Sequence, residues 1–332
     1  MNRLLIFAPN WLGDAVMALP AIADVRRASP GTTIAVMGPP AVAQLFGLVG
    51  DVDEVIEKGV GRGFRDGAAK TPPDPFFDAA LLLPNSFRSA LAAMRAGIPE
   101  RWGYRADCRG PLLTRAIDRS PSGTHQIDSY RRLVQALGFP NGAGEPRITV
   151  ADGIRRTAVD LLNGAGWDGR APLVAFAPGA AYGSSKRWPP RYFAELARSL
   201  AGDLVRTVLV GSGADAAVGR EIEVASGDPS IFLNLIGKTG LPALAGVLSS
   251  VRAVVANDSG AAHLAAALAT PVTTVFGPTD ERTNAPRSIA ASAALFHPVW
   301  CRPCWLRTCP LDHRCMRGVT AASVAHAARR ML

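Results

Sequence analysis

The feature that most constrains the fold is a repeated pattern in which a short apolar run ends at glycine or small polar residues and is followed by a helical stretch. Continuous apolar runs of this kind are typical of strands buried on both faces of a parallel sheet. The expected strands are residues 3–8, 32–38, 54–57, 79–83, 173–177, 207–211, 253–257 and 272–277. Strands that alternate with helices predict an α/β fold of doubly wound units.

The length and the spacing of the strands predict two domains. The chain has 332 residues, of which 48% are hydrophobic and 19% charged, as in a globular protein. The pattern fades near residues 140–155 and then restarts, so we expect two doubly wound Rossmann-like domains, 1–155 and 156–332, facing a central cleft. Ligands of such sheets bind outside the carboxyl ends of the strands. Residues 318–332 are expected to form a last helix, for which packing back on the first domain is one arrangement considered.

The charge balance favours anionic partners. Lys and Arg exceed Asp and Glu by 36 to 27, which gives a net charge of +9. Nucleic acid, anionic lipid surfaces and phosphorylated substrates all suit such a protein, and the charge does not choose among them. No apolar run reaches the roughly 18 to 20 residues that span a bilayer, and the start of the chain lacks the pattern of a signal peptide. We therefore expect a cytoplasmic protein, with a basic surface able to rest on a membrane.

The segment VVANDSGAAHL, residues 254–264, predicts a phosphate site at the end of an apolar strand. Asp258 or Ser259 is placed to cap the following helix, and Gly260 permits close approach of the backbone. The N–H groups and the positive dipole end of that helix suit a phosphate, and His263 lies one turn further on. The alternative is an ordinary strand-to-helix turn with a histidine satisfied in the core.

A second loop of this type, PGAAYGSSKRWPP, covers residues 178–190. Its glycines and serines, among them Ser185, are followed by Lys186, a suitable point-charge partner for phosphate. The loop lacks the G-x-x-x-x-G-K-[ST] pattern, so P-loop kinase chemistry is not indicated. A solvated turn is the alternative, and Trp188 is interpreted as a structural plug at the start of a helix.

Two further acidic residues follow expected strands. The stretch GSGADA, residues 211–216, matches a dinucleotide fingerprint, but the acidic residue required at the end of the next strand is missing. NAD(P) binding is therefore the weaker interpretation, and Asp215 is instead a candidate contact to a ribose or base. Asp14 lies at the start of the first helix, where it is either a cap or, beside an activated phosphate ester, a general base.

Four of the five cysteines lie within fifteen residues of one another. Their spacing is C-x2-C-x4-C-x5-C, which begins like a metal site but continues irregularly. A structural zinc site is one hypothesis, and free thiols in a loop region are the other. The cysteines concerned are Cys301, Cys304, Cys309 and Cys315.

Several segments together resemble the bacterial lipopolysaccharide heptosyltransferases. They are RLLIFAPNWLGDAVMALPAI, PGAAYGSSKRWPPRYFAELA and NDSGAAHLAAALATPVTTVFGPTD, and CRPCWLRTCPLDHRCM resembles the heptosyltransferase II branch. The resemblance implies the GT-B fold and transfer of L-glycero-D-manno-heptose from ADP-heptose to the first heptose of the lipopolysaccharide inner core, with inversion. It implies no cofactor, because ADP-heptose is a substrate, and no catalytic metal.

The resemblance also implies roles for individual residues. Asp14 matches the family's general base, and Lys186 matches the lysine on the donor diphosphate. The remaining donor contacts that it implies are Ser185, Asp215, Asp258, Ser259, Gly260 and His263. Ser259 stands where the related first heptosyltransferase has threonine.

The acceptor is expected to be the phosphorylated lipid A–Kdo–heptose core at the inner-membrane surface, with no role for nucleic acid. Its phosphates and carboxylates suit the net charge of +9. Arg62, Arg65 and Lys70, in the long basic loop 58–75, are the candidate acceptor contacts. The alternatives are a GT-B transferase or epimerase for another nucleotide sugar, an NAD(P)-dependent oxidoreductase, and a nucleotide-binding scaffold without activity.

Overall fold

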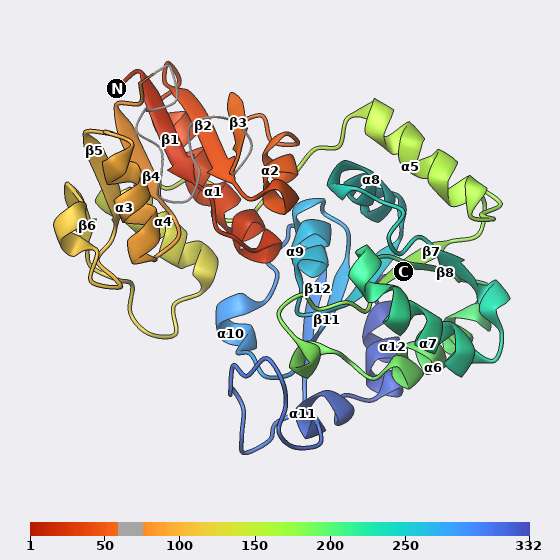
Figure 1. Cartoon of the computed structure of the whole chain (residues 1–332). Helices are drawn as coiled ribbons and strands as arrows, with labels where there is room; N and C mark the ends of the chain where they lie inside the picture. Colours follow the sequence, from red (N-terminus) through yellow and green to blue (C-terminus); the bar gives the residue numbers. More distant parts are fainter. Residues whose placement is uncertain (59–75) are drawn as a thin grey trace. The chain divides into compact units, whose positions relative to one another are not determined.

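The computed structural model of the chain describes residues 1–58 and 76–332, which form two compact units (Figure 1). The first unit covers Met1–Pro146 and the second Arg147–Leu332. The sequence pattern placed the division after residue 155. The division observed assigns the whole of α5 (Asp152–Gly164) to the second unit, where this helix packs on α8 (Leu241–Ser250).

The first unit contains a parallel sheet of six strands in the order β3-β2-β1-β4-β5-β6. The chain builds outward from β1 in one direction and then from β4 in the other, so the winding reverses between these two strands. The strands are β1 (Arg3–Phe7), β2 (Thr33–Gly38), β3 (Glu54–Glu57), β4 (Ala79–Leu82), β5 (Glu100–Tyr104) and β6 (Arg115–Ile117). The described helices are α1 (Leu12–Ala28), α2 (Pro40–Phe46), α3 (Phe87–Arg95) and α4 (Gln126–Ala136), with a 3₁₀ turn η1 (Gly110–Leu112).

The second unit repeats this topology. Its six parallel strands follow the order β12-β11-β10-β7-β8-β9, and the winding reverses between β7 and β10. The strands are β7 (Leu173–Ala177), β8 (Arg206–Leu209), β9 (Phe232–Asn234), β10 (Ala253–Asn257), β11 (Val272–Phe276) and β12 (Ser292–Phe296). Besides α5 and α8, its helices are α6 (Pro190–Ala201), α7 (Ala216–Ser226), α9 (Gly260–Ala267), α10 (Glu281–Asn284), α11 (Arg314–Arg317) and α12 (Ala321–Arg329). Its 3₁₀ turns are η2 (Ser184–Lys186), η3 (Gly213–Asp215) and η4 (Pro229–Ile231).

Helices cover both faces of the second sheet. Helices α5, α8 and α9 lie on one face, and α6, α7 and α12 lie on the other (Figure 1). The last helix, α12, packs on α6, β10 and β11 of its own unit, and its buried residues join the core there. In the same way α4, the last helix of the first unit, packs on α1. No helix among the described residues has the length and apolar character needed to cross a bilayer.

The central strands are almost fully buried because both faces of each sheet are covered by helices, as the continuous apolar runs predict. Trp188 shows how the loop after β7 is anchored to this core. Its ring is fully buried and packs edge-on against Phe193, with 4.8 Å between the ring centroids. Its indole N–H donates to the carbonyl oxygen of Val319 at 2.8 Å. The structural role predicted for this tryptophan is confirmed.

A tight helix contact in the second unit provides a test of this packing. A Cβ atom at Gly246 of α8 would lie 2.8 Å from both the carbonyl oxygen of Ile154 and the Cβ of Ala158 on α5. We predict that Gly246→Ala lowers the free energy of unfolding by about 1 to 3 kcal/mol, because the helices must separate. Gly164→Ala is the matched control, since nothing lies within 4 Å of its Cβ position. This control should be neutral or stabilising by up to about 1 kcal/mol. Urea unfolding measures both free energies, and a Gly164→Ala variant less stable than Gly246→Ala would refute the contact.

Candidate functional site

The two polar loops singled out in the sequence follow neighbouring central strands of the second sheet, at the carboxyl ends of these strands. Strands β7 and β10 are adjacent and parallel, with Ala177 paired to Ala256, so the segments that follow them start side by side. The winding of the sheet reverses between these strands. This is the position at which open α/β sheets bind ligands outside the carboxyl ends of their strands.

A buried ion pair joins the two loops. Lys186 Nζ lies 2.5 Å from Asp258 Oδ2, and the side chains are only 13% and 5% exposed. The hydroxyl of Thr279, from the turn after β11, donates to the same Oδ2 at 2.5 Å. Within the described parts of the chain, both side-chain hydrogen bonds of Asp258 fall on this one oxygen.

The loop that carries Lys186, residues 178–190 (the lysine loop), is also held by contacts away from Asp258. The ammonium group of Lys186 lies 4.8 Å from the ring centroid of Tyr182, a cation–π contact that offsets part of its desolvation. The hydroxyl of Tyr182 donates to the carbonyl oxygen of Trp305 at 2.5 Å. The hydroxyl of Ser185, expected to contact a ligand, is buried and donates to the carbonyl oxygen of Leu306 at 2.5 Å. Ser185 therefore holds the loop in place within the protein.

Asn257, the last residue of β10, connects the two loops directly. Its side-chain Nδ2 donates to the carbonyl oxygen of Pro178 at 2.7 Å, and its Oδ1 accepts from the backbone N–H of Trp188 at 3.0 Å. The side chain is fully buried, so both bonds are shielded from water. The carboxamide thereby fixes the start and the end of the lysine loop relative to Asp258.

The start of α9 has the features of an anion site. Ser259 precedes the helix in an extended conformation without capping it, and its buried hydroxyl has no partner within the described residues. Gly260 begins the helix, and the buried side chain of His263 lies in its first turn. The N–H groups at the start of a helix and the helix dipole favour a phosphate at this end.

Asp215 lies beside the loop that follows β7, residues 178–190. Its Oδ2 accepts from the backbone N–H and the hydroxyl of Ser212, at 3.0 and 2.8 Å. A Cβ at Gly179 would come within 2.5 Å of the Asp215 carboxylate, so only glycine permits this close approach after β7. The acidic group is thus placed at the carboxyl ends of β7 and β8, next to the lysine loop.

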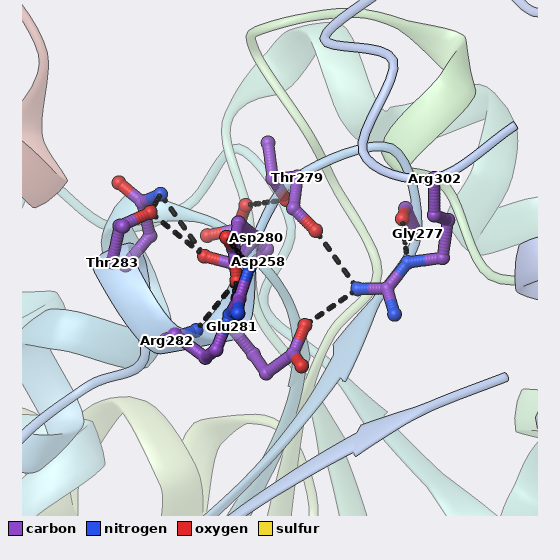
Figure 2. Close-up of polar contacts among 9 residues, drawn as sticks. Asp258, Gly277, Thr279, Asp280, Glu281, Arg282, Thr283 and Arg302 are labelled. Atoms are coloured by element: carbon purple, nitrogen blue, oxygen red, sulfur yellow. Dashed lines mark hydrogen bonds and ion pairs between the residues drawn. The ribbon is translucent and has the colours of Figure 1, made fainter. Parts of the chain in front are cut away.

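A set of residues that the sequence interpretation missed lies next to Asp258 in the turn after β11 (Figure 2). Arg302 donates to the carbonyl oxygens of Gly277 and Thr279 and to the carboxylate of Glu281. Thr279 follows β11, the neighbour of β10. Because ligands of such sheets bind outside the carboxyl ends of the strands, this position could have been predicted from the sequence. For Arg302 we find no signal in the sequence, because it comes from the distant cysteine-rich segment.

Asp14 occupies the corresponding position of the first sheet. It lies in the first turn of α1, directly after β1, and the winding of this sheet reverses between β1 and β4. Burial and the negative charge of Asp14 raise the pKa of Tyr130, which therefore keeps its proton at neutral pH. Each unit thus presents one of the two predicted catalytic residues, Asp14 or Lys186, at the switch point of its own sheet.

At the carboxyl end of β4 the first unit carries a fully buried arginine. Arg109 donates to the carbonyl oxygens of Tyr104 and Pro84, to the hydroxyl of Ser89 and to Asn85 Oδ1. Burial lowers the pKa of Arg109 to about 10, so it stays charged at neutral pH. Its bonds hold the turn between β4 and α3 in shape beside the switch point.

Two other predictions have different outcomes. Arg62, Arg65 and Lys70 lie outside the described residues. For the zinc hypothesis at Cys301, Cys304, Cys309 and Cys315, which stays a prediction, the arrangement gives no support: in residues 1–58 and 76–332, which include all four thiols, no group of three or more His, Cys, Asp or Glu side chains is arranged to hold a metal ion. Burial raises the pKa of the Cys315 thiol, which stays protonated at neutral pH.

The fold and the position of the site define a glycosyltransferase of the GT-B class, and the structural neighbours agree. The structure of E. coli ADP-heptose lps heptosyltransferase II superposes with a TM-score of 0.81 at 28% identity, covering 100% of this chain and 98% of that one. The E. coli heptosyltransferase WaaC with ADP gives a TM-score of 0.71 at 21% identity over 99% and 97% of the two chains, which shows the shared fold.

Sequence comparison identifies the family. Residues 75–314 match the model of glycosyltransferase family 9 (heptosyltransferase). Lipopolysaccharide heptosyltransferase 2 of Escherichia coli (strain K12) is 31% identical over 302 residues, which are 86% of each chain. The chain belongs to glycosyltransferase family 9. The resemblance noted in the sequence is thereby confirmed, and membership of this family decides against the NAD(P)-dependent oxidoreductase.

The buried ion pair has a consequence for stability. We predict that Lys186→Met lowers the free energy of unfolding by about 3 kcal/mol, because it leaves the Asp258 carboxylate buried without its cation. Adding Asp258→Asn should recover much of this loss, since the uncompensated charge is then removed.

Urea unfolding of the single and the double variant tests this expectation. Lys238→Met is the control, because Lys238 is a lysine of the same unit whose amine, among the residues that the structure describes, donates to the carbonyl oxygen of Asn234 alone. It should change the stability by less than about 0.5 kcal/mol. If the single and the double variant lose the same free energy of unfolding, the ion pair does not make the predicted contribution.

Proposed function

We propose that this protein is an ADP-heptose:lipopolysaccharide heptosyltransferase of the second kind, which moves L-glycero-D-manno-heptose from ADP-heptose to the first heptose of the lipopolysaccharide inner core. The observation that carries the proposal is the Lys186–Asp258 pair at the switch point of the second sheet, beside the start of α9, in a chain of family 9. Support for the particular acceptor comes from relatives named lipopolysaccharide heptosyltransferase 2.

The second unit is the proposed donor domain. As the glycosidic bond breaks, negative charge grows on the departing ADP. Lys186 and the N–H groups at the start of α9 are placed to offset that charge. The proposal therefore needs neither a cofactor nor a catalytic metal. Asp258 is proposed to orient Lys186 through Oδ2 and to accept a hydrogen bond from the donor through Oδ1.

The first unit is the proposed acceptor domain. Asp14 takes the proton from the acceptor hydroxyl as that oxygen attacks the anomeric carbon on the face opposite to ADP. A single displacement of this kind inverts the configuration at the anomeric carbon. The acceptor is anionic, which suits the net charge of +9, and the proposed location is the cytoplasmic surface of the inner membrane.

A transfer assay tests the activity and the base together. Mass spectrometry would follow the gain of one heptose on a core acceptor that carries a single heptose, with ADP-heptose and EDTA present. We expect Asp14→Ala to lower kcat by roughly 10²- to 10⁴-fold, because proton removal is lost, with ADP affinity unchanged. Asp152→Ala is the matched control, because Asp152 is also an acid in the first turn of a helix, and it should retain full activity.

Each opposite result has a definite meaning. Full activity of Asp14→Ala would exclude Asp14 as the base. No transfer by the folded wild type would exclude this donor and acceptor pair, and competition by UDP but not by ADP would then identify a transferase or epimerase for another nucleotide sugar. If the protein transfers no sugar from any nucleotide sugar tested, the alternative of a nucleotide-binding scaffold without activity is the one supported.

The acceptor contacts can be tested separately. We predict that charge reversal at Arg62 and Arg65 raises the KM for the acceptor at least about tenfold, through lost attraction to its phosphates. The KM for ADP-heptose should stay the same, because the donor is assigned to the other unit. Steady-state kinetics with each substrate varied in turn measures both values, and an unchanged acceptor KM would reject the assignment.

A further inference from the structure

We propose that Arg302 and Thr279 are positioning residues for the donor site, through which residues 302–307 of the cysteine-rich segment set the geometry of the Lys186–Asp258 pair. The inference rests on the proposed role of Lys186 at the donor diphosphate. It assigns a function to a segment whose cysteines belong to no metal-binding group among the described residues.

Thr279 provides the direct contact with the ion pair. Its side chain is 1% exposed, and its hydroxyl donates to Asp258 Oδ2 at 2.5 Å. Lys186 Nζ contacts the same oxygen at the same distance. Two donors on one oxygen fix the rotation of the carboxylate, and this rotation determines where Oδ1 points and where the ammonium group is held.

Residues 302–305 hold the turn that carries Thr279. Three consecutive carbonyl oxygens of this turn, those of Gly277, Pro278 and Thr279, accept hydrogen bonds from the segment. Arg302 Nε donates to Gly277 at 2.6 Å and Arg302 Nη2 to Thr279 at 2.8 Å, while the N–H groups of Cys304 and Trp305 both donate to Pro278 at 3.0 Å. All three residues of the turn are therefore held by hydrogen bonds, and Figure 2 shows those made by Arg302.

The arginine is itself held rigidly. Its side chain is 9% exposed, and its Nη2 also donates to Glu281 Oε2 at 2.7 Å. The guanidinium group lies 4.7 Å from the ring centroid of Phe296, at the end of the edge strand β12. A planar fork with several donors makes these contacts together, which a lysine in the same place does not.

The next residues of the same segment hold the lysine loop. The carbonyl oxygens of Trp305 and Leu306 accept from the hydroxyls of Tyr182 and Ser185, and that of Arg307 accepts from the backbone N–H of Ser185 at 3.1 Å. Residues 302–307 thus contact both sides of Asp258: the turn with Thr279 and the loop with Lys186. A shift of this segment moves both donors of the shared oxygen.

The central test compares Thr279→Val with Thr279→Ser in the full-length protein. We expect Thr279→Val to weaken ADP binding and raise the KM for ADP-heptose about tenfold, with the acceptor KM unchanged. Thr279→Ser keeps the hydroxyl and should stay within twofold of the wild type. Titration calorimetry with ADP and steady-state kinetics give these values, and equal behaviour of the two variants would overturn the role of the hydroxyl.

A double-mutant cycle shows whether Thr279 acts through the ion pair. In the Lys186→Met background, Thr279→Val should weaken ADP binding less than twofold, because the lysine that it positions is gone. A full tenfold effect in that background would mean that Thr279 acts independently, and the inference would fail. ADP binding of Lys186→Met equal to that of the wild type would instead refute the donor role of Lys186 in the proposed function.

Arg302→Lys tests the arginine, and Arg314→Met is its control. The lysine variant keeps the charge but loses the fork, so ADP affinity should fall at least fivefold. Arg314 belongs to the same cysteine-rich segment but is exposed, and within residues 1–58 and 76–332 its side chain pairs with Asp312 alone, so its variant should bind ADP like the wild type. If Arg302→Lys binds ADP like the wild type, Arg302 has no positioning role. If it does not fold, the comparison of Thr279→Val with Thr279→Ser decides the inference.

Discussion

The candidate site of the second unit depends on one buried interaction, the ion pair between Lys186 and Asp258. Burying two opposite charges stabilises a protein only when further polar contacts surround them. Here Thr279 donates to the carboxylate, and the ring of Tyr182 lies near the ammonium group. An ammonium group held in this way has a fixed position before a ligand arrives, and preorganised charge is the main source of transition-state stabilisation in reactions that expel an anionic leaving group.

The duplicated topology gives each unit its own position for polar residues at the carboxyl ends of its strands. Both sheets reverse their winding next to their first strand, and each carries a predicted catalytic residue at that point, Asp14 in the first sheet and Lys186 in the second. The two proposed roles require opposite charges, a base for the acceptor and a cation for the leaving group. Each of the two groups lies in its own unit and keeps its own electrostatic environment.

The local features of the site were predictable from the sequence. The strands that carry it, β1, β7, β10 and β11, are continuous buried runs, and the residues that follow them are polar. Asp14, Lys186 and Asp258 lie in the segments that follow such strands, and ligands of these sheets bind outside the carboxyl ends of the strands. The edge strands β6 and β12 are short or half-exposed, so they lack the apolar signal and were not predicted.

By itself the sequence determined the fold class, the two-domain organisation and the loops that carry the charged residues, because strand burial and helix starts depend on neighbours along the chain. Only the tertiary structure decided that Thr279 shares an oxygen with Lys186, that Ser185 is engaged within the protein, and that residues 302–307 brace both loops around Asp258. These contacts join segments far apart in the chain and use many backbone carbonyl oxygens. Every residue has a carbonyl, so no residue type reveals which ones will be bonded until the order of the strands brings the segments together.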